Sequence, residues 1–115
     1  ERLLPRDGSP VAVMSFSPPV VAWFRDHDPD TVRGLVASTR YRRELGWRLS
    51  SPAAHAALAD NLNVDFVAYD IRSLPNVFTI DWRRTRRPLL TWTVRTDGQR
   101  IRAARFTDAI IFEHP

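Results

Sequence analysis

The sequence predicts an α/β protein built around a parallel sheet. Short apolar runs alternate with segments of helical periodicity along almost the whole chain. Most of these runs are apolar at consecutive positions rather than at every second one, as in strands that helices cover on both faces of a parallel sheet. The length of 115 residues, with 43% hydrophobic and 26% charged residues, suits a single domain.

The first half of the chain predicts two strands and two helices. A strand is expected over residues 11–16, followed by a helix in which Ser17 is the N-cap and Pro18 the first helical residue. A second strand over 33–38 leads into a polar loop over 39–51, which is longer than most connections in α/β proteins. Such a loop is suspected of a functional role. A second Ser-Pro cap then starts a helix over 52–62.

The second half continues the alternation. Strands are expected over 64–70, 89–94 and 108–113, with helices over 74–87 and 96–106 between them, which gives the order βαβαβαβαβ. Periodicity also predicts which helical residues face the core. These are Val20, Val21 and Phe24; Ala54, Ala57, Leu58 and Leu62; Val77 and Ile80, with Phe78 or Trp82 as further candidates; and Ile101, Ala104 and Phe106.

Two architectures fit this order of elements. One is a complete open five-stranded doubly wound sheet, and the other is a five-strand section of a (β/α)8 barrel, whose full form needs about 250 residues. Composition does not choose between them.

The composition excludes several kinds of chemistry. The chain has no Cys, which excludes disulfides, zinc fingers and thiol catalysis. All 17 basic residues are Arg, so Schiff-base and P-loop lysines are also excluded. Only four glycines are present, and none forms a phosphate-binding glycine motif. The net charge of +4 is compatible with anionic partners, although an Arg-rich surface also serves solubility alone.

In both architectures ligands bind beyond the carboxyl ends of the strands. The residues at these ends are therefore the candidates for a site, and Trp92 stands out among them because an aromatic ring there can face a ligand or pack under the preceding loop. The other residues at these ends are Ser15, Phe16, Ser38, Tyr69, Asp70, Thr93, Glu113 and His114.

The remaining histidines and the densest basic run have less specific interpretations. His27 and His55 lie in helical segments and are expected to be solvated surface residues. His114 follows the last strand and is better placed for a site. The arginines of "RRTRR" at 83–87 end a helix, and a solvated helix end is favoured over nucleic-acid binding because no base-stacking aromatic motif accompanies them.

Two long stretches resemble one enzyme family. "VAVMSFSPPVVAWFRDHDPDTVRGLVAS" is similar to a strand-helix unit midway through the glycerophosphodiester phosphodiesterases. "PLLTWTVRTDGQRIRAARFTDAIIFEHP" resembles that family's closing section, in which a "WTV" strand, a turn, a helix and an "Asp-x-Ile-Ile" strand occur in order. The resemblance runs from about Val11 to Pro115. It implies that 1–115 is a single partial domain, the carboxyl-terminal section of a phosphodiesterase barrel.

The family hydrolyses glycerophosphodiesters to an alcohol and glycerol 3-phosphate, generally with a bound divalent metal such as calcium or magnesium. The resemblance implies that Trp92, Phe16 and Ser15 contact the substrate at the mouth of the barrel. The family's catalytic histidines, acidic metal ligands and "Glu-x-Lys" strand have no counterparts here, and Ser17 and Glu113 replace acidic residues of the family pattern. The chain is therefore expected to hold no catalytic or metal-binding residue and to be inactive alone.

Expectations about partners follow from the same resemblance. The substrate is a small glycerophosphodiester, and neither nucleic-acid binding nor a membrane span is expected. A barrel cut into a section exposes strand edges and one face, so the chain is predicted to self-associate. The alternative is a non-enzymatic, Arg-rich α/β module that binds an anionic partner through Arg40, Arg42, Arg43 and the arginines of 83–87. Nothing determines the cellular location, although the cytoplasm is slightly favoured.

Overall fold

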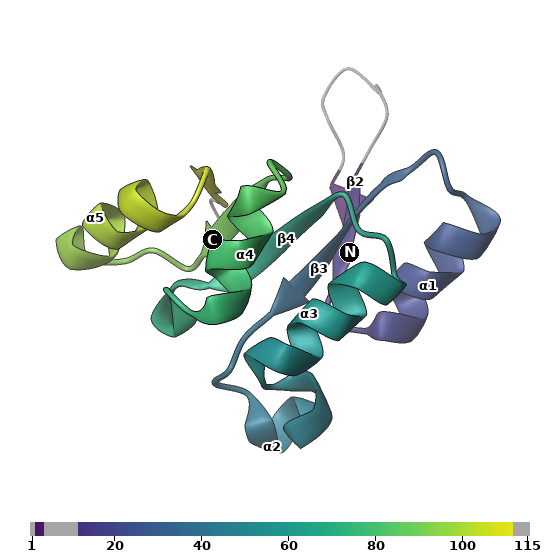
Figure 1. The fold of residues 1–115 in the computed structure, drawn as a ribbon, viewed down its shortest axis with the longest axis horizontal. Coiled ribbons are helices and arrows are strands. Elements are labelled where there is room, and N and C mark those ends of the chain that lie inside the picture. The colour runs from purple at the N-terminus through teal and green to yellow at the C-terminus, as the bar shows by residue number, and fades with distance from the viewer. Residues whose placement is uncertain (1, 4–11, 112–115) are drawn as a thin grey trace.

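The computed structural model describes residues 2–3 and 12–111, and it confirms an α/β fold (Figure 1). The strands of the sheet lie in the order β1-β2-β3-β4-β5-β6. Strand β1 is antiparallel to β2 and was not predicted, whereas the five predicted strands are all parallel. Their bounds are β1 Arg2–Leu3, β2 Ala12–Ser15, β3 Val32–Ala37, β4 Phe66–Asp70, β5 Leu89–Trp92 and β6 Ala109–Ile110.

The four predicted helices are present as α1, α3, α4 and α5. Pro18 and Pro52 start α1 and α3 as expected, and the Ser51 hydroxyl caps α3 by accepting a hydrogen bond from the Ala54 N–H. Ser17 occupies the N-cap position of α1, but its side chain makes no cap hydrogen bond. The bounds are α1 Pro18–His27, α3 Pro52–Asn61, α4 Val77–Arg84 and α5 Asp97–Phe106.

Three short helical segments complete the described chain. The segment over 39–51, predicted as a loop, contains α2 (Arg42–Leu45) and the 3₁₀ turn η1 (Trp47–Leu49). Gly46 separates them with a φ of 80°, a left-handed conformation that favours glycine. A second 3₁₀ turn, η2 (Ile71–Ser73), follows β4 directly.

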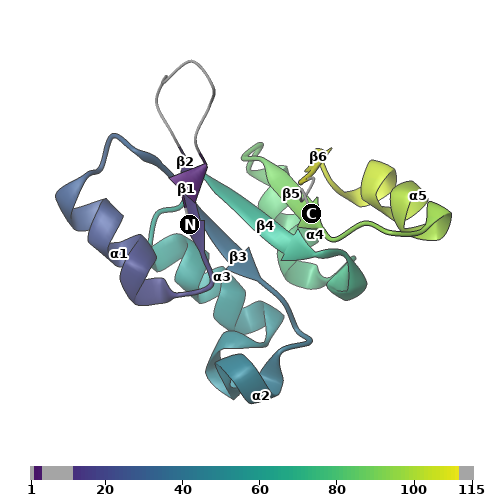
Figure 2. The same cartoon turned by 180° about the vertical axis from the view of Figure 1, so that it is seen from behind.

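One layer of helices packs on one face of the sheet. Figure 1 shows α3 and α4 in front of the strands, and Figure 2, the reverse view, shows β3 and β4 nearer the viewer. The main core lies between these layers, where α1 and α5 contribute Val21 and Ala103. Leu35, Val67 and Leu89 supply the sheet side of the core. None of the helices within the described residues has the length and apolar character needed to cross a bilayer.

Several predictions of core-facing helical residues are wrong. Val77 and Ile80 are 74% and 46% exposed, because α4 starts at its Asn76 cap with a phase that turns Phe78 and Trp82 inward. Trp82 is held there by a hydrogen bond from its indole N–H to the Pro88 carbonyl, at 2.9 Å. Exposed side chains where burial was expected are also found at Val20, Ala57, Ile101 and Ala104.

The expectation that His55 is a solvated surface residue is also wrong. His55 is 1% exposed, and both of its ring nitrogens have hydrogen-bond partners. Nε2 lies 2.8 Å from the Leu49 carbonyl oxygen and must donate to it, which leaves Nδ1 to accept from the Tyr69 hydroxyl at 2.6 Å. These two bonds allow a polar ring to be buried in the core. His27, by contrast, is exposed as expected and stacks on Trp23.

The second face of the sheet carries the alternate side chains of each strand. Val67 and Tyr69 belong to the helix-covered core, so Phe66, Ala68 and Asp70 face the other way. The Phe66 ring lies over Gly34 of the neighbouring strand, where glycine is required because any Cβ would overlap that ring. No helix within the described part of the chain packs on this face. The candidate site lies at its carboxyl-terminal end.

Candidate functional site

Three aromatic side chains meet at the carboxyl ends of the strands. Phe16 follows β2, Trp92 ends β5, and Tyr41 comes from the segment between β3 and α2. The Phe16 ring meets Tyr41 and Trp92 edge to face, with centroids 5.9 and 5.6 Å apart, and Tyr41 stacks on Trp92 at 6.2 Å. We call these three residues the aromatic cluster. Its contacts join elements that are far apart in sequence.

A cavity of about 280 Å³ opens beside the aromatic cluster. Ser15, Phe16 and Trp92, the three residues predicted to contact a ligand, all line it. Met14 and Val36 supply apolar surface from β2 and β3, so most of the lining is apolar. A small apolar site with a hydroxyl group at its edge suits a compact ligand that presents both carbon and oxygen atoms.

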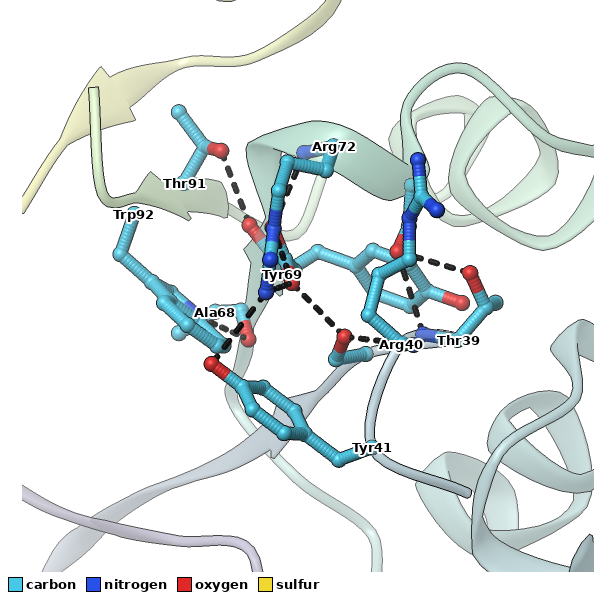
Figure 3. Close-up of polar contacts among 11 residues, drawn as sticks. Thr39, Arg40, Tyr41, Ala68, Tyr69, Arg72, Thr91 and Trp92 are labelled. Atoms are coloured by element: carbon cyan, nitrogen blue, oxygen red, sulfur yellow. Dashed lines mark hydrogen bonds and ion pairs between the residues drawn. The ribbon is translucent and has the colours of Figure 1, made fainter. Parts of the chain in front are cut away.

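Trp92 is fixed from two sides. Its indole N–H donates to the Ala68 carbonyl of β4 at 3.1 Å, while its ring stacks on Tyr41 (Figure 3). The ring is half-buried and still reaches the cavity. Trp92 therefore packs against the β3–α2 segment, as one of its two interpretations expected, and it also lines the cavity, whereas its contact with a ligand stays a prediction.

Beside the cluster, Asp70 is buried at the end of the central strand and is 1% exposed. Its carboxylate accepts hydrogen bonds from the Ser38 hydroxyl at 2.8 Å and from Arg72 Nη2 at 2.7 Å. Arg72 also donates from Nη2 to the Tyr41 hydroxyl at 3.2 Å, which links the ion pair to the aromatic cluster (Figure 3). These four residues form a continuous polar network under the site.

The network determines the charge of Asp70. Burial by itself raises the pKa of a carboxyl group, but the hydrogen bonds from Arg72 and Ser38 and the Arg72 charge outweigh it, so the pKa of Asp70 is lowered. The hydrogen bond to Asp70 also raises the pKa of Arg72. Asp70 is thus an ionised, fully hydrogen-bonded carboxylate, which suits it to hold Arg72 and Ser38 in place rather than to exchange a proton.

The other candidate residues at the strand ends occupy different positions. Tyr69 points toward the helices and bonds to His55, and burial raises the pKa of its phenol to about 12. Ser38 belongs to the Asp70 network. Glu113 and His114 lie outside the described residues.

The described residues do not fit a metal centre. Across 12–111 no group of three or more His, Cys, Asp or Glu side chains is placed to hold an ion. Asp70, the buried carboxylate at this end of the sheet, is already bonded to Arg72 and Ser38. The divalent metal expected for a phosphodiesterase remains a prediction that concerns ligands outside this set.

Sequence reasoning missed Tyr41 and Arg72. The unusual length of the loop over 39–51 was the available signal for Tyr41, but no pattern indicated that the loop folds back onto Trp92. Arg72 lies two residues beyond Asp70, and its pairing depends on the turn η2, where the Asp70 side chain also accepts from the Arg72 N–H at 2.9 Å. Comparison of the chain with protein-family models and with curated proteins finds no match.

Proposed function

We propose that this chain forms the substrate-side wall of a glycerophosphodiester phosphodiesterase barrel and contacts the glycerol part of the substrate. The observation that carries the proposal is the cavity at the carboxyl ends of the strands, where Ser15, Phe16 and Trp92 meet. Aromatic faces pack against the carbon side of a polyol, and a hydroxyl such as that of Ser15 can exchange a hydrogen bond with it. These are also the positions at which the chain resembles the family.

The strand order supports the barrel part of this proposal. The five parallel strands follow one another in sequence, β2-β3-β4-β5-β6, with the connecting helices contributing to one layer. A barrel wall is built in this way, whereas a doubly wound sheet reverses its strand order at a switch point. The second face of the sheet, which carries Phe66, Ala68 and Leu90, corresponds to the barrel interior.

In the proposed enzyme these residues bind and orient the substrate. Trp92 is held by Ala68 and Tyr41, so the cavity keeps its shape without a ligand. Bond cleavage needs a general acid and a general base, and in this family a metal as well. We expect the 115-residue chain to show no turnover of glycerophosphocholine or bis(4-nitrophenyl) phosphate, with or without calcium or magnesium.

The binding role is tested by nuclear magnetic resonance on the chain with its tryptophan indoles labelled. Titration with glycerophosphocholine should shift the indole signal of Trp92 more than that of Trp23, which is 52% exposed on α1 and outside the cavity. A Trp92→Leu variant should lose the binding, and the matched Trp23→Leu variant should keep it. Equal shifts of both indoles, or unchanged binding in Trp92→Leu, would contradict the proposal.

We also propose that the chain self-associates, because a section of a barrel exposes strand edges and one face of its sheet. Met14, Val36 and Leu90 on the second face are half-buried with no helix over them among the described elements, and β6 has no described partner on its outer edge. The edge of β2 differs, because Arg2–Leu3 of β1 pair with it. Static light scattering tests the proposal, and a monomer at high concentration would count against it.

The non-enzymatic alternative rests on a different observation. Arginines line an open pocket beside the aromatic cluster, which suits an anionic partner whether or not the chain belongs to a barrel. This alternative would be favoured if the chain bound an anion saturably but did not bind glycerophosphocholine.

A further inference from the structure

A second pocket, of about 740 Å³, lies between the β3–α2 segment and the segment that follows β4. Its lining includes four arginines, Arg40, Arg42, Arg43 and Arg72, and a single carboxylate, Glu44. We call it the arginine pocket. Figure 3 shows Arg40 on the far side of Arg72 from Trp92, and the lining residues of this pocket differ from those of the aromatic cavity.

The backbone that carries these arginines is held in place. The N–H and hydroxyl of Thr39 donate to the Ser73 hydroxyl at 3.1 and 2.9 Å, which ties the β3–α2 segment to η2. The Arg40 N–H donates to the Ser38 hydroxyl, which itself donates to Asp70. The two walls of the arginine pocket are therefore fixed to each other before a ligand arrives, which lowers the entropy cost of binding.

The charges in the arginine pocket are not balanced. Arg72 is neutralised by Asp70. Arg40, Arg42 and Arg43 form no ion pair with any residue over 12–111, and Arg42 instead stacks on the exposed Trp47 ring, 4.5 Å from its centroid. Three positive side chains around one pocket raise the electrostatic potential within it, and a bound anion would be stabilised by that potential.

The arginines at the opposite end of the sheet behave differently, although they also line a common pocket. Arg83 pairs with Asp108 and Arg84 with Asp81. Arg87 lies 3.9 Å above the Trp82 ring. Two of the four arginines there, Arg83 and Arg84, already have carboxylate partners, whereas Arg40, Arg42 and Arg43 have none among the described residues, so the arginine pocket is the stronger candidate for an anion.

We propose that the arginine pocket binds the phosphate group of a small phosphate monoester. Guanidinium groups donate paired hydrogen bonds to phosphate oxygens, and the dianion of a monoester suits a pocket lined by several arginines better than a singly charged carboxylate does. A volume of about 740 Å³ also leaves room for the organic part of such a ligand. This site lies outside the proposed glycerol cavity and does not depend on the phosphodiesterase assignment.

The proposal is tested by calorimetric titration of the full chain at low ionic strength with inorganic phosphate, glycerol 3-phosphate and a short single-stranded DNA. We expect saturable binding of the first two, and an Arg40→Gln/Arg43→Gln variant should bind at least about tenfold more weakly, because charge-assisted hydrogen bonds are lost. The control is Arg100→Gln/Arg102→Gln, which removes the same charge from exposed positions on α5 and should change the affinity less than about twofold.

The outcomes separate the possibilities. Equal losses in both variants would show that only net charge attracts the anion, and this result would overturn the proposal. Absence of saturable phosphate binding would overturn it too. DNA binding that is tighter than phosphate binding, and is lost in the Arg40→Gln/Arg43→Gln variant alone, would replace it with a nucleic-acid surface. Unchanged unfolding curves of both variants show that a loss of binding does not come from a loss of fold.

Discussion

Replacement of Asp70 by asparagine tests whether the buried polar network holds the site together. The asparagine side chain would keep one acceptor oxygen, so the bonds that Oδ1 accepts from the N–H and Nε of Arg72 can persist. An amide nitrogen would take the place of Oδ2, which now accepts from Arg72 Nη2 at 2.7 Å. The new amide N–H and the N–H of Arg72 Nη2 would then face each other as two donors. The Ser38 hydroxyl, in contrast, can rotate and accept a hydrogen bond from the amide.

The expected cost follows from these contacts. Loss of one charge-assisted hydrogen bond costs about 1.5–3 kcal/mol. The Arg72 side chain is 46% exposed, so water recovers part of its solvation, and we expect Asp70→Asn to lower the free energy of unfolding by about 2 kcal/mol at pH 7. With a urea dependence of about 1–3 kcal/mol/M, the unfolding midpoint should fall by about 1 M.

The difference in the free energy of unfolding between the wild-type chain and Asp70→Asn must also depend on pH. The pKa of Asp70 is lowered in the folded chain, so its carboxylate stabilises the fold at pH values above its unfolded pKa of about 3.9. That stabilisation is lost as the pH falls through the lower, folded pKa. Urea titrations followed by tryptophan fluorescence should therefore show that this difference in unfolding free energy is constant near neutral pH and becomes smaller below about pH 4.

Two controls make this prediction specific. Asp30→Asn removes an equal charge at an exposed position and should change stability by less than about 0.5 kcal/mol. The double variant Asp70→Asn/Arg72→Gln should cost less than the sum of the two single changes, because each removes the same bond. The role assigned to the network would be refuted if the effects of the two single variants on the free energy of unfolding were additive. It would also be refuted if the difference between wild type and Asp70→Asn had the same size at pH 3 and pH 7.

Two further predictions concern the core. Gly34→Ala should cost about 1–3 kcal/mol of unfolding free energy because its Cβ would overlap the Phe66 ring, and a Phe66→Leu change in the same chain should recover part of that loss in urea unfolding. Burial lowers the pKa of His55 in the folded chain. The contribution of neutral His55 to the free energy of unfolding should therefore be fully present above its unfolded pKa of about 6.5. Below that pH the free energy of unfolding should fall by at most about 1.4 kcal/mol per pH unit. His55→Gln should remove this slope, and an unchanged slope would assign it to another group.

Most of the fold could be predicted because the local signals agree. Continuous apolar runs located the five parallel strands, and the two Ser-Pro pairs located the starts of α1 and α3. The buried face of each helix was harder to predict, because these helices have only two or three turns. A shift of one residue at the cap changes which side chains of such a helix point to the core. This explains why Phe78 and Trp82 of α4 are buried while Val77 and Ile80 are exposed.

The site was predictable only in part. Trp92 and Phe16 both lie at the ends of parallel strands, and the carboxyl ends of such strands meet at one edge of the sheet, so their proximity follows from the topology. The position of Tyr41 depends on how the β3–α2 segment folds back, which no periodicity describes. His55 was misjudged because its two hydrogen-bond partners, Leu49 and Tyr69, are far from obvious in an alanine-rich helical sequence.

The sequential strand order has a consequence for how the molecule fluctuates. Each described strand pairs only with the strands that come before and after it in the chain, so every ladder joins neighbouring elements of the sequence and each βα unit rests on the one before it. β4 lies between β3 and β5, and opening it breaks two ladders, whereas detaching β6 breaks one ladder among the described residues, the one with β5. Resistance to local opening should therefore be higher for the inner strands than for β6, and the Asp70 network lies at the end of one of these inner strands.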